Sequence, residues 1–244
     1  MNNAEYCVII STYNNENSLA SVIDSVLQHV DDVIVVNDGA TDNTGDILSL
    51  YKDKIKIISY SLNRGKGYAL KCGFDYACEM GYFYAITIDS DGQHCADDIL
   101  DFLTAVKKHP NSLIIGNRNL TQENMPRKNT FANRFSNFWF AVHTGTKLPD
   151  TQTGFRLYPL ARMKKLRPFT SRYEAELEML VRCAWRGIKI ISIPVNVFYP
   201  PEEKRVTHFR PGRDFLRISL LNTLFTFLAV VYGYPRKMLR WICH

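Results

Sequence analysis

The sequence lacks most of the short patterns that identify cofactor sites and secreted proteins. Its six cysteines form no C-x-x-C pair, so we expect reduced thiols and neither a disulfide framework nor a zinc site. No G-x-G-x-x-G follows the first strand-like segment and no GxxxxGK[ST] occurs, which argues against a nucleotide-binding dehydrogenase and a P-loop protein. Internal repeats, low-complexity tracts and a signal-peptide pattern before Tyr6 are also absent, so a cytoplasmic protein is expected.

Composition indicates an ordinary globular chain with a basic balance. With 244 residues, 46% hydrophobic and 22% charged, the chain is long enough for one large domain with a real core. A formal charge of +6 suits an anionic partner such as nucleic acid, a phosphorylated small molecule or an acidic membrane surface. Basic residues are interspersed with acidic ones and no recognition motif is present, so nucleic acid is not the expected partner.

Strand-like and helix-like segments alternate through the first half of the chain. Five apolar segments bounded by polar residues are YCVIIST, DDVIVVN, KIKIISY, YFYAITID and SLIIGN, with amphipathic segments between them. This order predicts an α/β fold with a mostly parallel sheet and helices on both faces. The alternation lapses after about residue 120 near Pro126, and a final unit follows with a strand over 150–159, a helix over 173–187 and a strand over 188–200.

Polar or small residues follow each of the first four predicted strands. They read STYNNE, NDGATDNT, SLNRGKGYA and DSDGQH. Ligands of such sheets bind outside the carboxyl ends of the strands, so these loops should converge on one polar crevice.

The segment DSDGQH places Asp89 and Asp91 on a turn directly after a buried strand. Two close carboxylates raise the pKa of one of them unless a cation stabilises both, and with Gln93 they form a set of hard oxygen ligands suited to Mg²⁺ or Mn²⁺. Such a metal would keep coordination positions for phosphate oxygens. A solvated turn with an aspartate capping the next helix is the alternative.

The segment NRGKG supplies two cations, Arg64 and Lys66, just before a helix. Its glycines allow close backbone approach, and a helix N-terminus favours an anion. A solvated basic turn is the alternative to an anion-binding loop.

The apolar tail over 215–234 lies between basic residues, with Arg213 and Arg217 around its start and Arg236, Lys237 and Arg240 after it. Its apolar stretch barely reaches the roughly 17 to 25 residues of a spanning helix. A helix lying in the membrane interface with basic anchors fits better. A helix buried against the domain is the equal alternative.

These segments together resemble the family-2 nucleotide-sugar glycosyltransferases, and among them the polyprenyl-phosphate branch similar to dolichol-phosphate mannose synthase. The matching segments, in family order over the first 200 residues, are VIISTYNNENSL, VIVVNDGATDNT, NRGKGYALKCGF, ITIDSDGQH, GNR, DTQTGFRLYP and RYEAELEML. The resemblance implies a GT-A (Rossmann-like) fold. It further implies a catalytic domain over 1–210, with a nucleotide-sugar half at 1–118 and an acceptor half at 119–210, and a membrane-associated apolar helix over 211–244.

The resemblance also assigns roles on the donor side. It implies nucleotide-sugar binding by the set Ser11, Tyr13, Asn15, Asp38, Lys66 and Asp89. It implies that Asp89, Asp91 and Gln93 hold Mg²⁺ or Mn²⁺ and the diphosphate, with Asp91 the expected direct ligand and a catalytic residue. Ser11 stands where the family usually has proline, Asn15 where it often has glutamate, and Asn37 where it usually has aspartate. The identity of the nucleotide base is therefore left open, and the donor is either GDP-mannose or a UDP-hexose.

On the acceptor side the branch implies polyprenyl phosphate. A phosphate monoester has its second pKa near 6, so it is an anionic nucleophile at neutral pH and needs cations more than a base. Arg118, Arg134 and Arg205 match the arginines around the lipid phosphate. Attack from the face opposite the leaving diphosphate implies inversion, at the inner, cytoplasmic face of the membrane.

The alternative within the family is a saccharide hydroxyl acceptor, which requires a general base. Helical period places Glu174 and Glu178 on one face of the segment RYEAELEML and turns Glu176 away. The position of this segment in the family motif nevertheless favours Glu176 as the acidic catalytic residue, and Glu178 is the second candidate. The non-functional alternative is a solvated acidic helix start, which the helix dipole favours. The alternative to an enzyme is a scaffold protein that keeps the binding pocket but has no catalytic activity.

Overall fold

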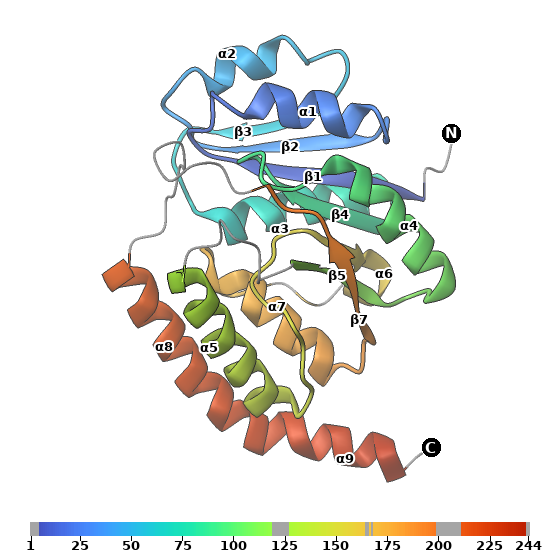
Figure 1. The fold of residues 1–244 in the computed structure, drawn as a ribbon, viewed down its shortest axis with the longest axis vertical. Helices are drawn as coiled ribbons and strands as arrows, with labels where there is room; N and C mark the ends of the chain where they lie inside the picture. The colour runs from blue at the N-terminus through green and yellow to red at the C-terminus, as the bar shows by residue number, and fades with distance from the viewer. Residues whose placement is uncertain (1–4, 119–126, 164–165, 167, 199–210, 243–244) are drawn as a thin grey trace.

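The structure is a computed structural model that describes residues 5–118, 127–163, 166, 168–198 and 211–242. A seven-stranded sheet in the order β3-β2-β1-β4-β6-β5-β7 runs through it (Figure 1). The strands are β1 (Tyr6–Thr12), β2 (Val33–Asp38), β3 (Lys56–Tyr60), β4 (Tyr84–Asp89), β5 (Leu113–Arg118), β6 (Arg156–Pro159) and β7 (Ile190–Val195). All neighbouring strands are parallel except β6, which is antiparallel to both β4 and β5. The predicted mostly parallel sheet is confirmed.

Helices cover both faces of this sheet, as predicted. The helices before the apolar tail are α1 (Leu19–Leu27), α2 (Thr44–Ser49), α3 (Lys66–Glu79), η1 (Ala96–Asp98), α4 (Ile99–Lys108), α5 (Arg127–Thr144), α6 (Leu160–Met163) and α7 (Glu174–Trp185). One core lies between the sheet and α1, α2 and α4, and the other lies between the sheet and α3, α6 and α7. β2 is buried along its whole length because both of its faces meet a core, which explains its unbroken apolar run.

Two features of the second half differ from the predicted pattern. The predicted strand over 150–159 is a strand only at Arg156–Pro159, and its first part is a loop. The basic, aromatic segment after Pro126 forms the helix α5, which the alternation pattern did not reveal. Both differences place side chains at the carboxyl edge of the sheet.

The apolar tail forms α8 (Pro211–Leu228), a π-helical turn η3 (Ala229–Gly233) and α9 (Tyr234–Ile242). Figure 1 shows α8 running beside α5. Leu221, Phe225 and Ala229 are buried against the domain, while many large apolar side chains of the same helices remain exposed. The stretch Leu216–Arg240 is long and apolar enough to cross a membrane by length and composition alone.

Polar residues within the tail have a packing partner in α5. His143 is fully buried, and its Nε2 lies 3.2 Å from the carbonyl oxygen of Asn222 and 3.3 Å from Oγ1 of Thr226. Trp185 donates its Nε1–H to the carbonyl oxygen of His143 at 2.8 Å. Because a buried polar group needs such partners, these contacts fix the register between α5, α7 and α8.

Candidate functional site

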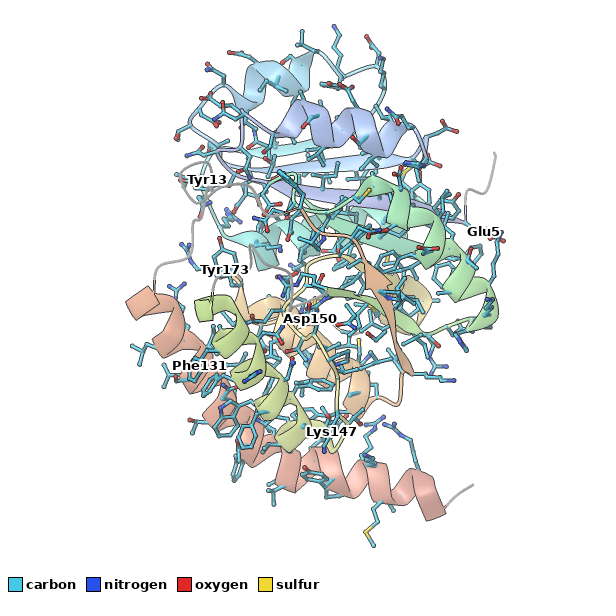
Figure 2. The ribbon with its side chains drawn as sticks, viewed as in Figure 1. Glu5, Tyr13, Phe131, Lys147, Asp150 and Tyr173 are labelled. Atoms are coloured by element: carbon cyan, nitrogen blue, oxygen red, sulfur yellow. The ribbon has the colours of Figure 1, made fainter. Side chains whose placement is uncertain are left out.

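The loops after β1 and β4 form one unit at the carboxyl edge of the sheet. Ser11 and Asp89 are register partners at the ends of these strands. Asn15 donates its Nδ2–H to Oγ of Ser90 at 2.7 Å, and Ser18 donates its hydroxyl to the carbonyl oxygen of Ser90 at 2.6 Å. Figure 2 shows Tyr13 on the side of the molecule where these strands end. The predicted convergence of these loops is confirmed.

Asp38 orders the loop that leads to Lys66. Its buried carboxylate accepts hydrogen bonds from the backbone N–H groups of Arg64 and Gly65, at 2.7 and 2.8 Å, and from Nδ2 of Asn63 at 3.0 Å. Several donors on one carboxylate fix a short loop in a single conformation. The predicted contact between Asp38 and a nucleotide base stays a prediction.

The glycines of the NRGKG segment allow two helices to meet. A Cβ at Gly65 would lie 2.6 Å from the carbonyl oxygen of Ser171, and one at Gly67 would lie 2.3 Å from Cβ of Ala175. In the structure these glycines make room for the segment entering α7, which lies against the first turn of α3. This contact brings the start of α7 to the predicted site. The predicted approach of an anion to this backbone stays a prediction.

Lys66 stands between two carboxylates that come from different parts of the chain. Its Nζ lies 2.6 Å from Oδ1 of Asp89 and 3.1 Å from Oε2 of Glu176. Burial acts to lower the pKa of Lys66, but the two carboxylates outweigh it and raise that pKa above its usual value. Lys66 is therefore a permanently charged link between the loop after β4 and the first turn of α7.

The negative charge of Asp91 is less well stabilised by its neighbours than that of Asp89. Oδ1 of Asp91 accepts the backbone N–H of Gln93 at 3.0 Å. Burial, and then the charge of Asp89, raise the pKa of Asp91 to about 6. For Asp89 burial also acts to raise the pKa, but the charge of Lys66 outweighs it and lowers that pKa. The sequence predicted that one of the two carboxylates would have a raised pKa, and in the structure it is Asp91.

The residues of this loop fit a divalent cation. Asp89, Asp91 and Gln93 offer oxygen donors of the kind that Mg²⁺ and Mn²⁺ prefer, and a cation would stabilise the undercompensated charge on Asp91. Within the described ranges, no group of three or more His, Cys, Asp or Glu side chains is arranged to hold a metal. A cation here would depend on few protein ligands and would leave positions for phosphate oxygens.

His94 lies at the site, although no role was predicted for it from the sequence. Its side chain is 5% exposed, and its Nε2 lies 4.0 Å from Oδ2 of Asp89. Burial lowers the pKa of His94 to about 4, so the ring is neutral at physiological pH and packs on Phe155. Its position next to Gln93 in the sequence was the one indication that His94 lies at the site, and sequence position does not reveal where the ring points.

A second ionic cluster lies at the same edge of the sheet. Arg118 donates from Nε and Nη2 to the two carboxylate oxygens of Asp150, at 2.6 and 3.0 Å. Asp150 is fully buried and also accepts Nδ2 of Asn133 at 2.6 Å and the backbone N–H of Gln152 at 3.0 Å. This network joins the end of β5 to α5 and to the loop before β6.

The predicted acceptor residues are only partly brought together. Arg118 lies at the site edge, held by Asp150, and it contributes to lowering the pKa of Asp89. Arg134 lies on α5 with an exposed side chain. Arg205 lies outside the described residues. Their joint role around a phosphate stays a prediction.

The three glutamates of α7 differ in their partners, although all three are buried. Glu176 faces Lys66, and its Oε1 has no hydrogen-bond partner among the residues that the structure describes. Glu178 accepts the backbone N–H groups of Phe169 and Thr170 and pairs with Arg182 at 2.5 Å. The structure therefore places Glu176, not Glu178, beside the other predicted site residues.

The chain is similar in sequence to known proteins. The sequence profile of Glycosyl transferase family 2 matches residues 7–166. The UDP-N-acetylglucosamine--dolichyl-phosphate N-acetylglucosaminyltransferase of Methanococcus voltae is 27% identical over 213 residues, covering 79% of this chain and 85% of that protein. The dolichyl-phosphate beta-glucosyltransferase of Homo sapiens is 28% identical over 247 residues, covering 87% of this chain and 74% of that protein.

The fold also matches a solved enzyme. Glucosyl-3-phosphoglycerate synthase from Mycobacterium tuberculosis, solved in complex with Mn²⁺, uridine diphosphate and phosphoglyceric acid, superposes with a TM-score of 0.65 at 20% identity, covering 92% of this chain and 77% of that chain. The GT-A fold implied by the sequence resemblance is confirmed. Because the family match spans residues 7–166, the chain belongs to glycosyl transferase family 2, and it is a nucleotide-sugar-dependent glycosyltransferase.

Proposed function

We propose that the protein transfers a hexose, with inversion, from a nucleotide diphosphate sugar to polyprenyl or dolichyl phosphate in a metal-dependent reaction. The observation that carries this proposal is a buried carboxylate beside an ion-paired cluster at the carboxyl edge of the sheet. Lys66 is paired with Asp89 and Glu176 there, and burial and the charge of Asp89 raise the pKa of Asp91 to about 6. Both relatives named above use dolichyl phosphate according to their names, which supports the acceptor class.

On the donor side, Asp89, Asp91 and Gln93 would hold Mg²⁺ or Mn²⁺ beside the diphosphate. The bound cation would stabilise the negative charge that develops on the leaving nucleoside diphosphate. Lys66 is fixed next to that position and contributes a further positive charge. We assign Ser11, Tyr13, Asn15 and Asp38 to the nucleotide side of the crevice. GDP-mannose and the UDP-hexoses are the donors to test.

The partner of Glu176 favours a phosphate acceptor. Its Oε2 is engaged in an ion pair with Lys66 at 3.1 Å, so Glu176 acts on the charge and position of Lys66 rather than as a free base. A phosphate nucleophile needs no base at neutral pH, and arginines suit it because the guanidinium fork matches phosphate oxygens. Arg118, Arg134 and Arg205 are the proposed contacts.

The alternative acceptor is a saccharide hydroxyl, as in glycan or cell-surface polysaccharide synthesis. One oxygen of Glu176, Oε1, accepts no hydrogen bond from the described part of the chain, and we propose that oxygen as the one that would take a proton. Taking up a proton there would remove the negative charge of Glu176, so this reading requires its ion pair with Lys66 through Oε2 to weaken during the reaction.

The tail helices and α5 would bind the cytoplasmic membrane surface. Leu220, Leu224, Phe227, Val230 and Val231 of the tail are 46 to 65% exposed, and Phe131 and Phe138 of α5 are 72 and 60% exposed. Arg217, Arg236 and Arg134 are exposed on the same helices. Apolar residues rimmed by basic ones bind anionic lipid surfaces. We accordingly propose a catalytic domain over 1–210, divided near 118, and a membrane-associated segment over 211–244.

Transfer of radiolabelled sugar tests the proposed reaction. A panel of UDP- and GDP-sugars is incubated with short-chain polyprenyl phosphate and Mn²⁺ or Mg²⁺, with and without EDTA. Metal-dependent label in the lipid phase is expected with the wild type and not with Asp91→Ala. Asp97→Ala is the matched control, because the Asp97 side chain is 78% exposed and pairs with His29. Metal-dependent donor hydrolysis without lipid label would move the acceptor to a hydroxyl, and no signal from folded protein would refute the enzyme.

Vesicle flotation tests the proposed membrane face. The wild type should float with vesicles of phosphatidylglycerol and phosphatidylcholine, and a Leu220→Asp, Phe227→Asp double variant should remain at the bottom of the gradient. Leu50→Asp is the matched control, since Leu50 is 80% exposed and follows α2, away from the tail. Equal flotation of all three proteins would contradict the assignment.

A further inference from the structure

Arg156 is a charged residue in the interior of the molecule. It lies on β6 between β4 and β5, where it is the register partner of Thr87 and Ile115, and it is 0% exposed. Among the described residues, no carboxylate lies within ion-pair distance of its guanidinium. Burying a charge without a direct counter-ion is unfavourable, so such a residue requires a specific set of partners.

The partners of Arg156 are backbone carbonyl groups from two segments. From the loop before β6, the carbonyl oxygen of Thr153 accepts Nε at 2.7 Å and that of Thr151 accepts Nη2 at 2.9 Å. From α7, the carbonyl oxygen of Glu176 accepts Nη1 at 2.8 Å, and Oη of Tyr158 lies 3.3 Å from the same nitrogen. One planar group therefore joins the loop to the first turn of α7.

Both segments end at the Lys66 cluster. A Cβ at Gly154 would lie 2.6 Å from Oδ2 of Asp89 and 2.8 Å from Nζ of Lys66, so the loop closes directly over this ion pair. Thr87 holds the loop there by donating its hydroxyl to the carbonyl oxygen of Gly154 at 2.6 Å. On the other side, Glu176 contributes the second carboxylate to Lys66.

We propose that Arg156 is a positioning residue for the transfer reaction. By fixing the loop and the α7 turn to each other, it sets the space in which Lys66 is held between Asp89 and Glu176. The inference rests on the proposed function, because its effect is read in the transfer step. Lysine keeps the charge but cannot make the same fork of hydrogen bonds, so Arg156→Lys separates geometry from charge.

A double-mutant cycle on transfer kinetics tests this proposal. Arg156→Lys, Glu176→Gln and the double variant are compared with the wild type, after circular dichroism and thermal melting have shown that each is folded. We expect Arg156→Lys to lower kcat about 10- to 100-fold with the donor KM changed less than about threefold. In the Glu176→Gln background the same change should lower kcat less than about threefold, because both residues act through Lys66.

The matched control is Arg182→Lys, a half-buried arginine of α7 whose partner is Glu178. Its effect should be the same in both backgrounds. Equal effects of Arg156→Lys in the two backgrounds would overturn the proposal.

A milder variant covers the case in which Arg156→Lys does not fold. Tyr158→Phe removes only the phenol oxygen beside Nη1, and it should lower kcat several-fold, again less so in the Glu176→Gln background. An unchanged kcat would overturn the proposal. If the wild type transfers no sugar, the proposed function fails separately, and the cycle is then read in the affinity for UDP with Mn²⁺ by calorimetry, where additive effects would overturn the inference.

Discussion

Two ionic clusters lie at the carboxyl edge of the same sheet, and they differ in how completely their carboxylates are satisfied. Asp150 accepts both Arg118 contacts, Asn133 and a backbone N–H, and all of these partners are held by neighbouring elements. In the Lys66 cluster, by contrast, Oε1 of Glu176 has no hydrogen-bond partner within the described ranges. Saturation is typical of a group that holds the scaffold, whereas unused acceptor capacity beside a fixed cation is typical of a group that acts on a ligand.

Electrostatics sharpen the same comparison. Burial acts to raise the pKa of Asp150, but the hydrogen bonds and charge of Arg118 lower it. Asp91 shows the opposite result, with a pKa raised to about 6 by burial and by Asp89. Asp150 and Asp91 are therefore the same residue type at the same edge of the sheet. They differ in how many hydrogen-bond donors and cations stabilise the charged carboxylate.

Asp91→Asn should have the largest effect on activity. Losing the charge of the proposed metal ligand removes stabilisation of the leaving diphosphate, and we expect a fall in transfer of about 1,000-fold. Stability should not fall, because the variant relieves the repulsion with Asp89. Transfer assays and thermal melting of the two proteins measure both effects. A fall in transfer of less than tenfold at saturating Mn²⁺ would contradict the assignment.

Glu176→Gln and Glu178→Gln should separate site from scaffold on one helix. Removing the charge of Glu176 disturbs Lys66, so we expect kcat to fall about 100-fold with little change in stability. Glu178 holds Phe169, Thr170 and Arg182, and its loss should lower the free energy of unfolding by about 2 kcal/mol. Steady-state kinetics and urea denaturation of both variants test the contrast, and the reverse pattern would exchange their roles.

The sequence predicted the parallel half of the sheet because its signals are local. Alternation of apolar and amphipathic segments located β1 to β5, and polar residues after the strands indicated the edge of the sheet at which the loops meet. Helical period could not choose among the α7 glutamates. The choice depends on the close approach of α7 to α3 at Gly67, which is a tertiary contact. The motif register, carried by the family resemblance, did indicate Glu176.

Other features were beyond prediction for physical reasons. The aromatic and basic residues of α5 follow no simple helical stripe, because the helix contacts both the domain and α8. Arg156 reads as a polar position within a short strand, and only the folded chain shows that carbonyl groups of two segments surround its guanidinium. Asp150 was included in a predicted strand, but its side chain is held by Arg118 in a loop.

Asp150→Asn should affect stability more than chemistry. We expect the free energy of unfolding to fall by about 2 kcal/mol at pH 7, because the charged hydrogen bonds to Arg118 are lost. The folded-state pKa of Asp150 is lowered, so its contribution is present above the unfolded pKa of about 3.9 and is lost as the pH falls through the folded value. Urea denaturation at pH 7 and pH 3 should therefore show a smaller difference between wild type and variant at the lower pH. A difference independent of pH would contradict the ion pair.

Gly67→Ala should have the smallest effect, and it tests how the two helices of the Lys66 cluster are joined. The added methyl group would lie 2.3 Å from Cβ of Ala175, so α3 and α7 must separate slightly, at about 1 to 2 kcal/mol of stability. Gly45→Ala in α2 is the control, since no atom of the described residues lies within 4 Å of its Cβ position. The greater helix propensity of alanine should stabilise the protein by about 0.5 kcal/mol. Because Lys66 precedes Gly67 and Glu176 follows Ala175, the separation also lengthens their ion pair. Gly67→Ala should therefore lower kcat severalfold while Gly45→Ala leaves it unchanged, and equal kcat values would show that the cluster tolerates movement of α7.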